Sequence, residues 1–278
     1  MMSRTKILLL GLLAMLTVSA VPSATASAAE LQGPWWRHPE SKGSQKQVKW
    51  PENEEHATKA SNEGQGNFRL FSKGNPVLGN ITIECKKVTS AGDIWDGLHQ
   101  GEASTRILFE ECSSSGTISG KCPKVTIGET ISYSELVWKY RGESKELKEV
   151  GQQKIYDVFA PTDEPKGGKA VYTTLSVPEG CIGHGTLFEV AAVGSEATFV
   201  DQDQDAHPVV WGMAAVVEPQ NEDVTKGFLH WTSPNVTKLH HQEKEVVAKL
   251  EFAGHPAELE GTVAVELNSG EKSGAFDE

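Results

Sequence analysis

The acidic run DQDQDAH at residues 201–207 combines residue types and a spacing that could bind a metal. Asp201, Asp203 and Asp205 alternate along it, between the apolar stretches EATFV and PVVWG. Calcium loops begin with carboxylates at alternate positions because Ca²⁺ takes several oxygen ligands. Ala206 and Gly212 stand where an EF-hand has its glycine and its closing glutamate. The run is therefore not an EF-hand. It indicates a looser calcium site or, alternatively, an acidic hairpin tip in solvent.

Four cysteines form the second chemical feature, and their spacing indicates disulfides. They are Cys85, Cys112, Cys122 and Cys181. An even number of cysteines in an exported chain pairs because the thiols leave the reducing cytosol. The chain has neither the C-x-x-C of redox proteins nor the closely paired ligands of a structural zinc site. The sequence leaves the pairing open. We expect Cys112–Cys122, which would clamp a Ser/Gly-rich loop, together with Cys85–Cys181.

Three tryptophans are candidates for ligand binding. Trp95 lies between Asp93 and Asp96 in GDIWDGL, and an aromatic ring beside carboxylates can hold a sugar. The alternative is a core tryptophan at the end of a strand. Trp35 and Trp36 lie in a polar N-terminal stretch. They either dock onto the folded domain or are exposed for a partner.

The sequence contains none of the common catalytic motifs. It has no G-x-S-x-G, no phosphate-binding G-x4-G-K-[ST] and no H-E-x-x-H. A glycoside hydrolase needs only two suitably placed carboxylates, and the chain has 38 acidic residues. A hydrolase acting through carboxylates that the sequence does not single out therefore remains open.

The N-terminal residues have the layout of a secretory signal peptide. Arg4 and Lys6 precede the apolar stretch 7–16, and small residues follow as far as Glu30. The apolar stretch is shorter than the roughly 20 residues that span a bilayer. We expect a signal peptide over 1–29 and a secreted protein, extracellular or in the cell envelope. No membrane insertion is expected after the signal is removed, although an uncleaved anchor is the alternative.

Charge narrows the range of partners. The formal net charge is −12 at pH 7. Such a chain is repelled by phosphate backbones and by anionic membranes. We therefore expect no nucleic-acid partner. The sequence carries no signal of oligomeric state.

Alternating hydrophobic residues predict strands through most of the chain. The pattern is clear in NITIECKK, SELVWKYR, EVVAKLEF and GTVAVELN, and Gly, Pro, Ser and Asp interrupt it regularly. HPVVWGMAAVVEP is apolar throughout, which is typical of one strand buried on both faces. We expect an all-β, disulfide-stapled fold of antiparallel sandwich or meander type. An irregular, polar and partly disordered leader would occupy 30–75 and the β-rich domain 76–278. A division into two smaller sandwiches near 160–168 is the second choice.

Several of these features recur together in one group of proteins. They are a strand ending ITIEC, the following ILFEEC, a third cysteine shortly after, a late C-x-G-x-G and the tail AKLEFAGHPAELEGTVAVELNSGEKSGAF. The chain over residues 78–276 resembles exported proteins of unknown function from high-GC Gram-positive soil bacteria. The resemblance implies a secreted β-rich fold with paired cysteines, and it implies no activity.

These observations together favour a non-catalytic extracellular or envelope-associated protein with a binding or structural role. Its partner would be an envelope glycan or a protein surface, and calcium is the one cofactor that the residues suggest. The alternative is a secreted hydrolase acting on polysaccharide.

Overall fold

The structure is a computed structural model, and it describes residues 33–42, 44–76, 78–98, 100–116, 120–139, 154–222, 224–231, 239–241 and 244–276. Every regular element within these residues is a β-strand, and all pairings between strands are antiparallel. The predicted all-β antiparallel class is therefore confirmed. The predicted signal peptide lies outside the described residues. No helix in the described part of the chain is long and apolar enough to cross a membrane.

The strands fall into two groups along the chain. The first ten are β1 (Trp35–Pro39), β2 (Gln47–Lys49), β3 (His56–Ser61), β4 (Phe68–Asn75), β5 (Gly79–Asp96), β6 (Gly101–Gly116), β7 (Gly120–Ile127), β8 (Thr130–Lys139), β9 (Ile155–Pro161) and β10 (Lys169–Ser176). The others are β11 (Leu187–Val193), β12 (Ala197–Val200), β13 (Ala206–Val209), β14 (Met213–Glu218), β15 (Gly227–Trp231), β16 (Leu239–His241), β17 (Lys244–Val246), β18 (Leu250–Phe252), β19 (His255–Leu267) and β20 (Gly274–Phe276).

The main sheet closes on itself twice. Strands β3, β5, β6, β8, β9, β14, β15 and β19 form one closed circuit, because β19 pairs again with β3. We call it circuit one. Circuit two runs through β4, β5, β6, β7, β10, β11, β18 and β19 and closes where β19 pairs with β4. Closure leaves these strands without a free edge.

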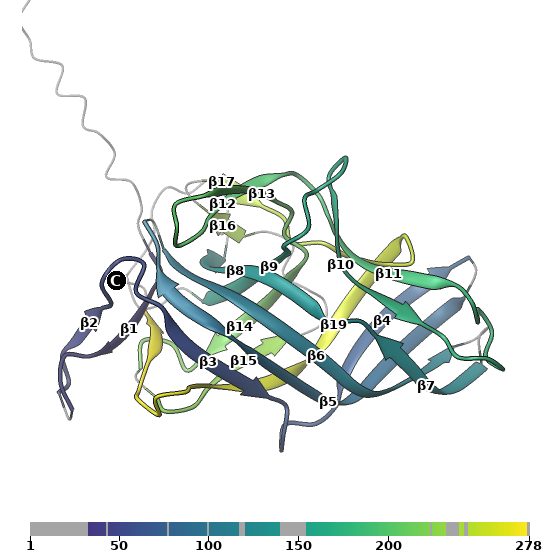
Figure 1. Cartoon of the computed structure of the whole chain (residues 1–278), viewed down its shortest axis with the longest axis horizontal. Helices are drawn as coiled ribbons and strands as arrows, with labels where there is room; N and C mark the ends of the chain where they lie inside the picture. Colours follow the sequence, from purple (N-terminus) through teal and green to yellow (C-terminus); the bar gives the residue numbers. More distant parts are fainter. Residues whose placement is uncertain are drawn as a thin grey trace, which may run out of the picture. The chain divides into compact units, whose positions relative to one another are not determined.

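Three long strands belong to both circuits, and they join the two into one sheet (Figure 1). They are β5, β6 and β19, with 18, 16 and 13 residues. Part of β5 pairs with β4 and part with β3, and β6 is likewise divided between β7 and β8. Residues Leu31–Glu278 consequently form one compact unit, and the alternative of two sandwiches divided near 160–168 is not what the structure shows.

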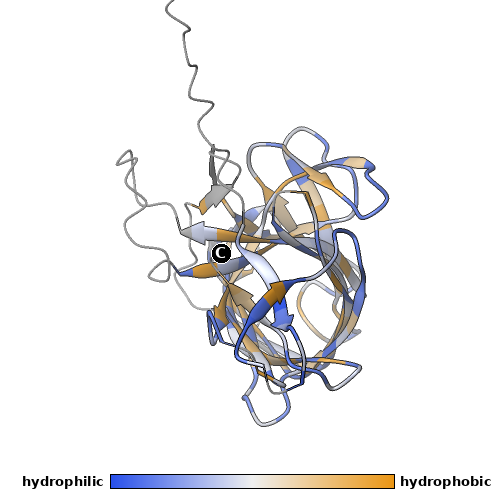
Figure 2. Ribbon diagram, turned by 90° about the vertical axis from the view of Figure 1, so that its left-hand side faces the viewer, coloured by the Kyte–Doolittle hydropathy of each residue, from blue (hydrophilic) through white to orange (hydrophobic). Residues whose placement is uncertain are grey.

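Side chains inside the circuits form the main hydrophobic core. Phe68 and Leu70 of β4 and Ile81 and Ile83 of β5 are buried, as their alternation predicts. In Figure 2 hydrophobic residues lie along the strands, while most of the outlying turns are hydrophilic. Strand β9 is buried at every position, because a second core covers its outer face. That core includes Val158, Phe199 and Trp211.

The segment HPVVWGMAAVVEP forms two strands rather than the single strand we expected. Its first part belongs to β13, which pairs with β12 in a separate hairpin, and its second part is β14 of the main sheet. Gly212 lies between them. A Cβ on Gly212 would stand 2.7 Å from both the Tyr172 ring and the Ala192 Cβ, so the chain passes too close to β10 and β11 for a side chain.

The expected leader over 30–75 contains strands β1 to β4, so residues 35–75 are not irregular. Strands β3 and β4 belong to the main sheet, whereas β1 and β2 form a small sheet with β20. Trp35 and Trp50 are buried there. The polar composition of this region hid its strands. Their outward residues are polar and few of their inward residues are large, as in HATKAS of β3, with its burial pattern ieBeBi.

The disulfide pairing we expected is wrong. The structure joins Cys85 to Cys112 and Cys122 to Cys181. Cys85 and Cys112 are direct partners on β5 and β6, with their Cα atoms 4.0 Å apart. This pairing follows from the register of the two strands, and both bonds lie in the wall of circuit two. Two disulfides are consistent with an oxidising, extracellular environment.

Candidate functional site: an internal cavity with a buried aspartate

Circuit one encloses a cavity of about 100 Å³, and every strand of the circuit contributes to its wall. Most of the wall is apolar. The side chains include Ala60, Val88, Ile107, Phe159, Met213, Trp231 and Val263. The volume is of the order that holds a molecule somewhat smaller than benzene, since an apolar cavity of about 150 Å³ binds benzene. A second cavity of about 50 Å³ lies inside circuit two.

Aromatic rings form one side of the cavity of circuit one. The Trp231 ring lies 5.3 Å from the Phe68 ring and 5.5 Å from the Phe159 ring, measured between centroids. Gly261 of β19 gives Phe68 its space, because a Cβ there would stand 2.5 Å from the Phe68 ring. The rings are thus fixed by close packing between β4, β9 and β15.

The wall also contains buried polar atoms that have no hydrogen-bond partner within the described part of the chain. They are Asp157 Oδ1, Ser134 Oγ and Trp231 Nε1. Their residues are 4%, 1% and 5% exposed. Leaving a buried polar atom without a partner costs about 1–3 kcal/mol. A few convergent polar groups in an otherwise apolar cavity are typical of a small-molecule site.

Asp157 lies on β9 between Ile155 and Phe159, on the face that points into circuit one. Burial raises the pKa of its carboxyl group to about 8, the neighbouring Ser134 lowers it somewhat, and the charge of Glu135 raises it. The Ser134 hydroxyl lies beside the carboxyl without forming a well-aligned hydrogen bond to Oδ1. Asp157 is therefore largely protonated at neutral pH when nothing is bound.

The cavity reaches toward the surface at the turn between β14 and β15. Glu218 and Pro219 of this turn belong to its wall, and the Glu218 side chain is 55% exposed. Trp36 of β1 and Ala275 of β20 line the same end. A ligand would therefore enter beside the small sheet formed by β1, β2 and β20.

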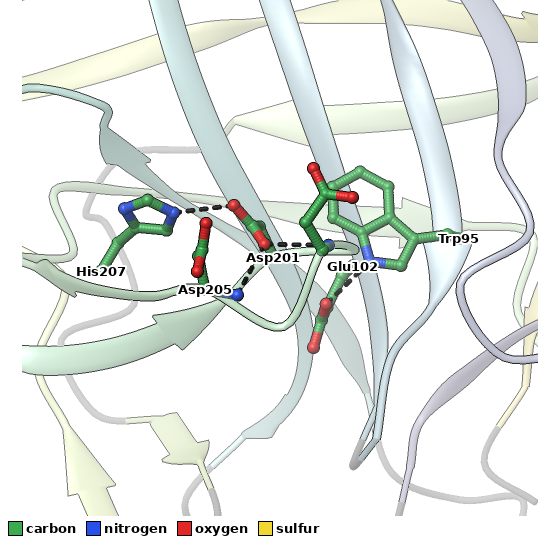
Figure 3. A network of polar contacts seen from close by, with 6 residues as sticks. Trp95, Glu102, Asp201, Asp205 and His207 are labelled. Atoms are coloured by element: carbon green, nitrogen blue, oxygen red, sulfur yellow. Dashed lines mark hydrogen bonds and ion pairs between the residues drawn. The ribbon is translucent and has the colours of Figure 1, made fainter.

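A different group of carboxyls is buried on the outer face of circuit one. The indole N–H of Trp95 donates to Glu102 Oε2 at 2.8 Å (Figure 3), and Glu102 stands directly opposite Glu135 across the β6–β8 ladder. Burial raises the pKa of Glu102 to about 9, and Glu135 adds to the rise. Neither Glu102 nor Glu135 lines the cavities described above. The pair is therefore poorly placed to act on a polysaccharide.

Asp96 fixes the N-terminal strands to circuit one. Its carboxylate oxygens accept hydrogen bonds from the backbone N–H groups of Trp36, at 2.8 Å, and Trp50, at 3.1 Å. Burial raises the pKa of Asp96 to about 7, although these two hydrogen bonds and Lys49 oppose the rise. The role of Asp96 is therefore structural.

Asp201 of the predicted calcium run closes the β12–β13 hairpin. Its Oδ1 accepts backbone N–H groups of Asp203 at 2.9 Å and Asp205 at 3.0 Å, and its Oδ2 lies 2.8 Å from His207 Nε2 (Figure 3). Burial acts against ionisation of Asp201, but these hydrogen bonds outweigh it and hold its pKa below the usual value. No group of three or more potential ligands that could hold a metal ion occurs among the described residues. The structure thus favours the hairpin-tip alternative over calcium.

The tryptophans predicted to bind a ligand are not presented at the surface. Trp95 is 2% and Trp35 is 6% exposed, and Trp36 is half-buried with its indole N–H donating to the Glu102 carbonyl. The remaining tryptophans, Trp50, Trp138, Trp211 and Trp231, are also buried. The docked and core alternatives are therefore the correct ones for these three residues.

Sequence reasoning missed Asp157, and yet a signal was present. In KIYDVFAP a single charged residue shares its parity with Ile155 and Phe159, which are core positions. A charge on the inward face of an otherwise apolar strand points to a buried polar site. Our search looked for clusters of chemical residues, and Asp157 is isolated in the sequence.

Comparison of the chain with protein-family models, with curated proteins and with solved structures finds no match in any of the three.

Proposed function

We propose that this is an exported, non-catalytic binding protein that holds a small, mainly apolar molecule inside circuit one. The observation that carries the proposal is the cavity itself, whose apolar wall contains unpaired polar atoms of Asp157, Ser134 and Trp231. Export is supported by the two disulfides and by the signal-like N-terminal sequence. The resemblance to secreted β-rich proteins agrees with this assignment.

The proposal replaces glycan or protein-surface binding by tryptophans with binding in the interior, because the tryptophans are covered. It also ranks above the hydrolase alternative. The carboxyl pair Glu102 and Glu135 is 5% and 1% exposed, which leaves no room for a polysaccharide beside it.

Met213 provides a direct test, because it lines the cavity and is the only methionine beyond residue 15. The full chain would be labelled with ¹³C at the methionine methyl groups and titrated with isobutanol. We expect the Met213 methyl resonance to shift saturably. The thermal midpoint should rise as the ligand concentration rises.

Two variants of β3 provide the matched comparison. Ala60→Leu fills the cavity and should abolish the saturable shift, whereas Lys59→Leu changes the outer face of the same strand and should retain it. Circular dichroism would verify that both variants fold. If isobutanol leaves the Met213 methyl unchanged in the unmodified protein, or if Ala60→Leu binds as well as Lys59→Leu, the proposed function is wrong.

A further inference from the structure

The charged groups that line the cavity of circuit one all have the same sign. They are Asp157 in the interior and Glu218 and Glu266 toward the surface, and no lysine, arginine or histidine is among the described residues of the wall. Glu266 is 2.8 Å from Lys226 and Glu218 is 3.4 Å from His230, so both outer carboxylates have cationic or ionisable neighbours. Asp157 is in a different situation.

No cation of the described chain compensates Asp157. The groups that act on its carboxyl are the Ser134 hydroxyl and the Glu135 carboxyl, and Oδ1 is left without a hydrogen bond. Its neighbours across the sheet are Leu136 of β8 and Ala215 of β14. A carboxyl in such surroundings is stabilised most by a ligand that brings a positive charge and hydrogen-bond donors together.

The rest of the wall is suited to the same kind of ligand. Rings of Phe68, Phe159 and Trp231 border the cavity, and the faces of aromatic rings attract cations. The aliphatic side chains of Val88, Ile107 and Val263 would cover a short hydrocarbon group.

We infer that the cavity binds a small aliphatic amine as its ammonium ion, with Asp157 as the counter-ion. The inference rests on the proposed function, because it names the chemical class of the ligand for the same cavity. Bond formation is limited to hydrogen bonds and the ion pair. The one proton that moves leaves the Asp157 carboxyl for the buffer when the ammonium ion enters, so that a neutral empty site becomes a paired, overall neutral complex.

Isobutylamine and isobutanol are suitable probes because they differ mainly in the polar group. Affinities would be measured at pH 7 from the Met213 methyl shift. We expect the amine to bind at least about tenfold more tightly than the alcohol, since a charge-assisted hydrogen bond is stronger than a neutral one. In Asp157→Asn, which keeps the size of the side chain, the amine should lose this advantage while the alcohol binds within about threefold of its original affinity.

Proton release gives a second measurement that needs no variant. Titration calorimetry in two buffers of different ionisation enthalpy should show close to one proton released for each isobutylamine bound and close to none for isobutanol. Glu218→Gln, at the outer end of the wall, should leave the proton count unchanged.

The outcomes separate this inference from the proposed function. Binding of the alcohol as tightly as the amine, amine binding without proton release, or an amine preference that survives in Asp157→Asn would each overturn the inference and leave the proposed function in place. Failure of both probes to bind would overturn the two together.

Discussion

Three carboxyl groups are buried by this fold, and the effect on their pKa values is the same in direction. The pKa is raised to about 7 for Asp96, about 9 for Glu102 and about 8 for Asp157, and burial is the largest cause each time. A raised pKa in the folded state stabilises the protein below the unfolded pKa of the group, and this stabilisation is lost as the pH rises through the folded pKa. We therefore expect these groups to favour the folded state at mildly acidic pH.

Glu102→Gln tests this at one residue. Glutamine is neutral, and its amide oxygen can still accept the hydrogen bond from Trp95 Nε1. Between the unfolded value of 4.5 and the folded value of about 9, the unmodified protein should lose stability with rising pH, by up to about 1.4 kcal/mol per pH unit for one such group. The variant should lose less, and its free energy of unfolding should exceed that of the unmodified protein at pH 8.

Urea unfolding at pH 5 and at pH 8 measures the effect. Glu179→Gln changes an exposed glutamate and should leave the pH dependence as it is. A slope that is identical for Glu102→Gln and the unmodified protein would show that Glu102 is not protonated in the folded state.

The β12–β13 hairpin is the element whose stability depends most clearly on one side chain. It places Phe199, fully buried, against Tyr133, with 4.5 Å between ring centroids. The hairpin covers the second core beside β9, and Asp201 holds its turn together through two backbone N–H groups. The acidic run is thus explained by the geometry of a tight turn, which Asp side chains commonly stabilise.

Asp201→Ala should destabilise the protein by about 1–2 kcal/mol, because it removes the acceptor for those backbone groups. Asp201→Asn keeps an oxygen acceptor and should lose less. Asp203→Ala, at an exposed position, should stay within about 0.5 kcal/mol of the original. Chemical unfolding at pH 7 gives all three values. A rise in the unfolding midpoint with Ca²⁺ that disappears in Asp201→Asn would restore the calcium interpretation.

At the scale of the whole molecule, both disulfides strengthen circuit two, whereas the cavity with Asp157 belongs to circuit one. The Cys122–Cys181 bond closes a loop of sequence separation 59, which in the loop-entropy model contributes about 4 kcal/mol. We expect the double variant Cys122→Ser/Cys181→Ser to lose stability of about this size, as measured by urea unfolding. Its affinity for the cavity probes should stay within about threefold, as measured from the Met213 methyl. A complete loss of binding in a variant that remains folded would contradict this separation.

The strands and their inward faces were predictable because alternation is a local property. Ile81, Ile83 and Cys85 are buried as their parity predicts. The closure of the circuits was not predictable in this way, because pairing of β19 with β3 and β4 joins residues far apart in the sequence.

The disulfide error has a local cause that could have been avoided. Gly97 donates its N–H to the Gln100 carbonyl in the turn between β5 and β6, and a hairpin centred there places Cys85 opposite Cys112. Recognising that turn would have fixed the pairing of all four cysteines. The cavity was harder to foresee, because its wall is assembled from every strand of circuit one and only Asp157 gives a signal in the sequence.

The position of β19 in both circuits has a consequence for how the chain acquires its structure. Strands β3 and β4 are among the first to be synthesised, yet each finds one of its two partners in β19. A growing chain therefore cannot complete either circuit until β19 has been made, and it waits with unpaired strand edges. Folds dominated by such distant pairings form slowly. A polypeptide that delays its own closure in this manner stays extended enough to be threaded through a narrow translocation pore.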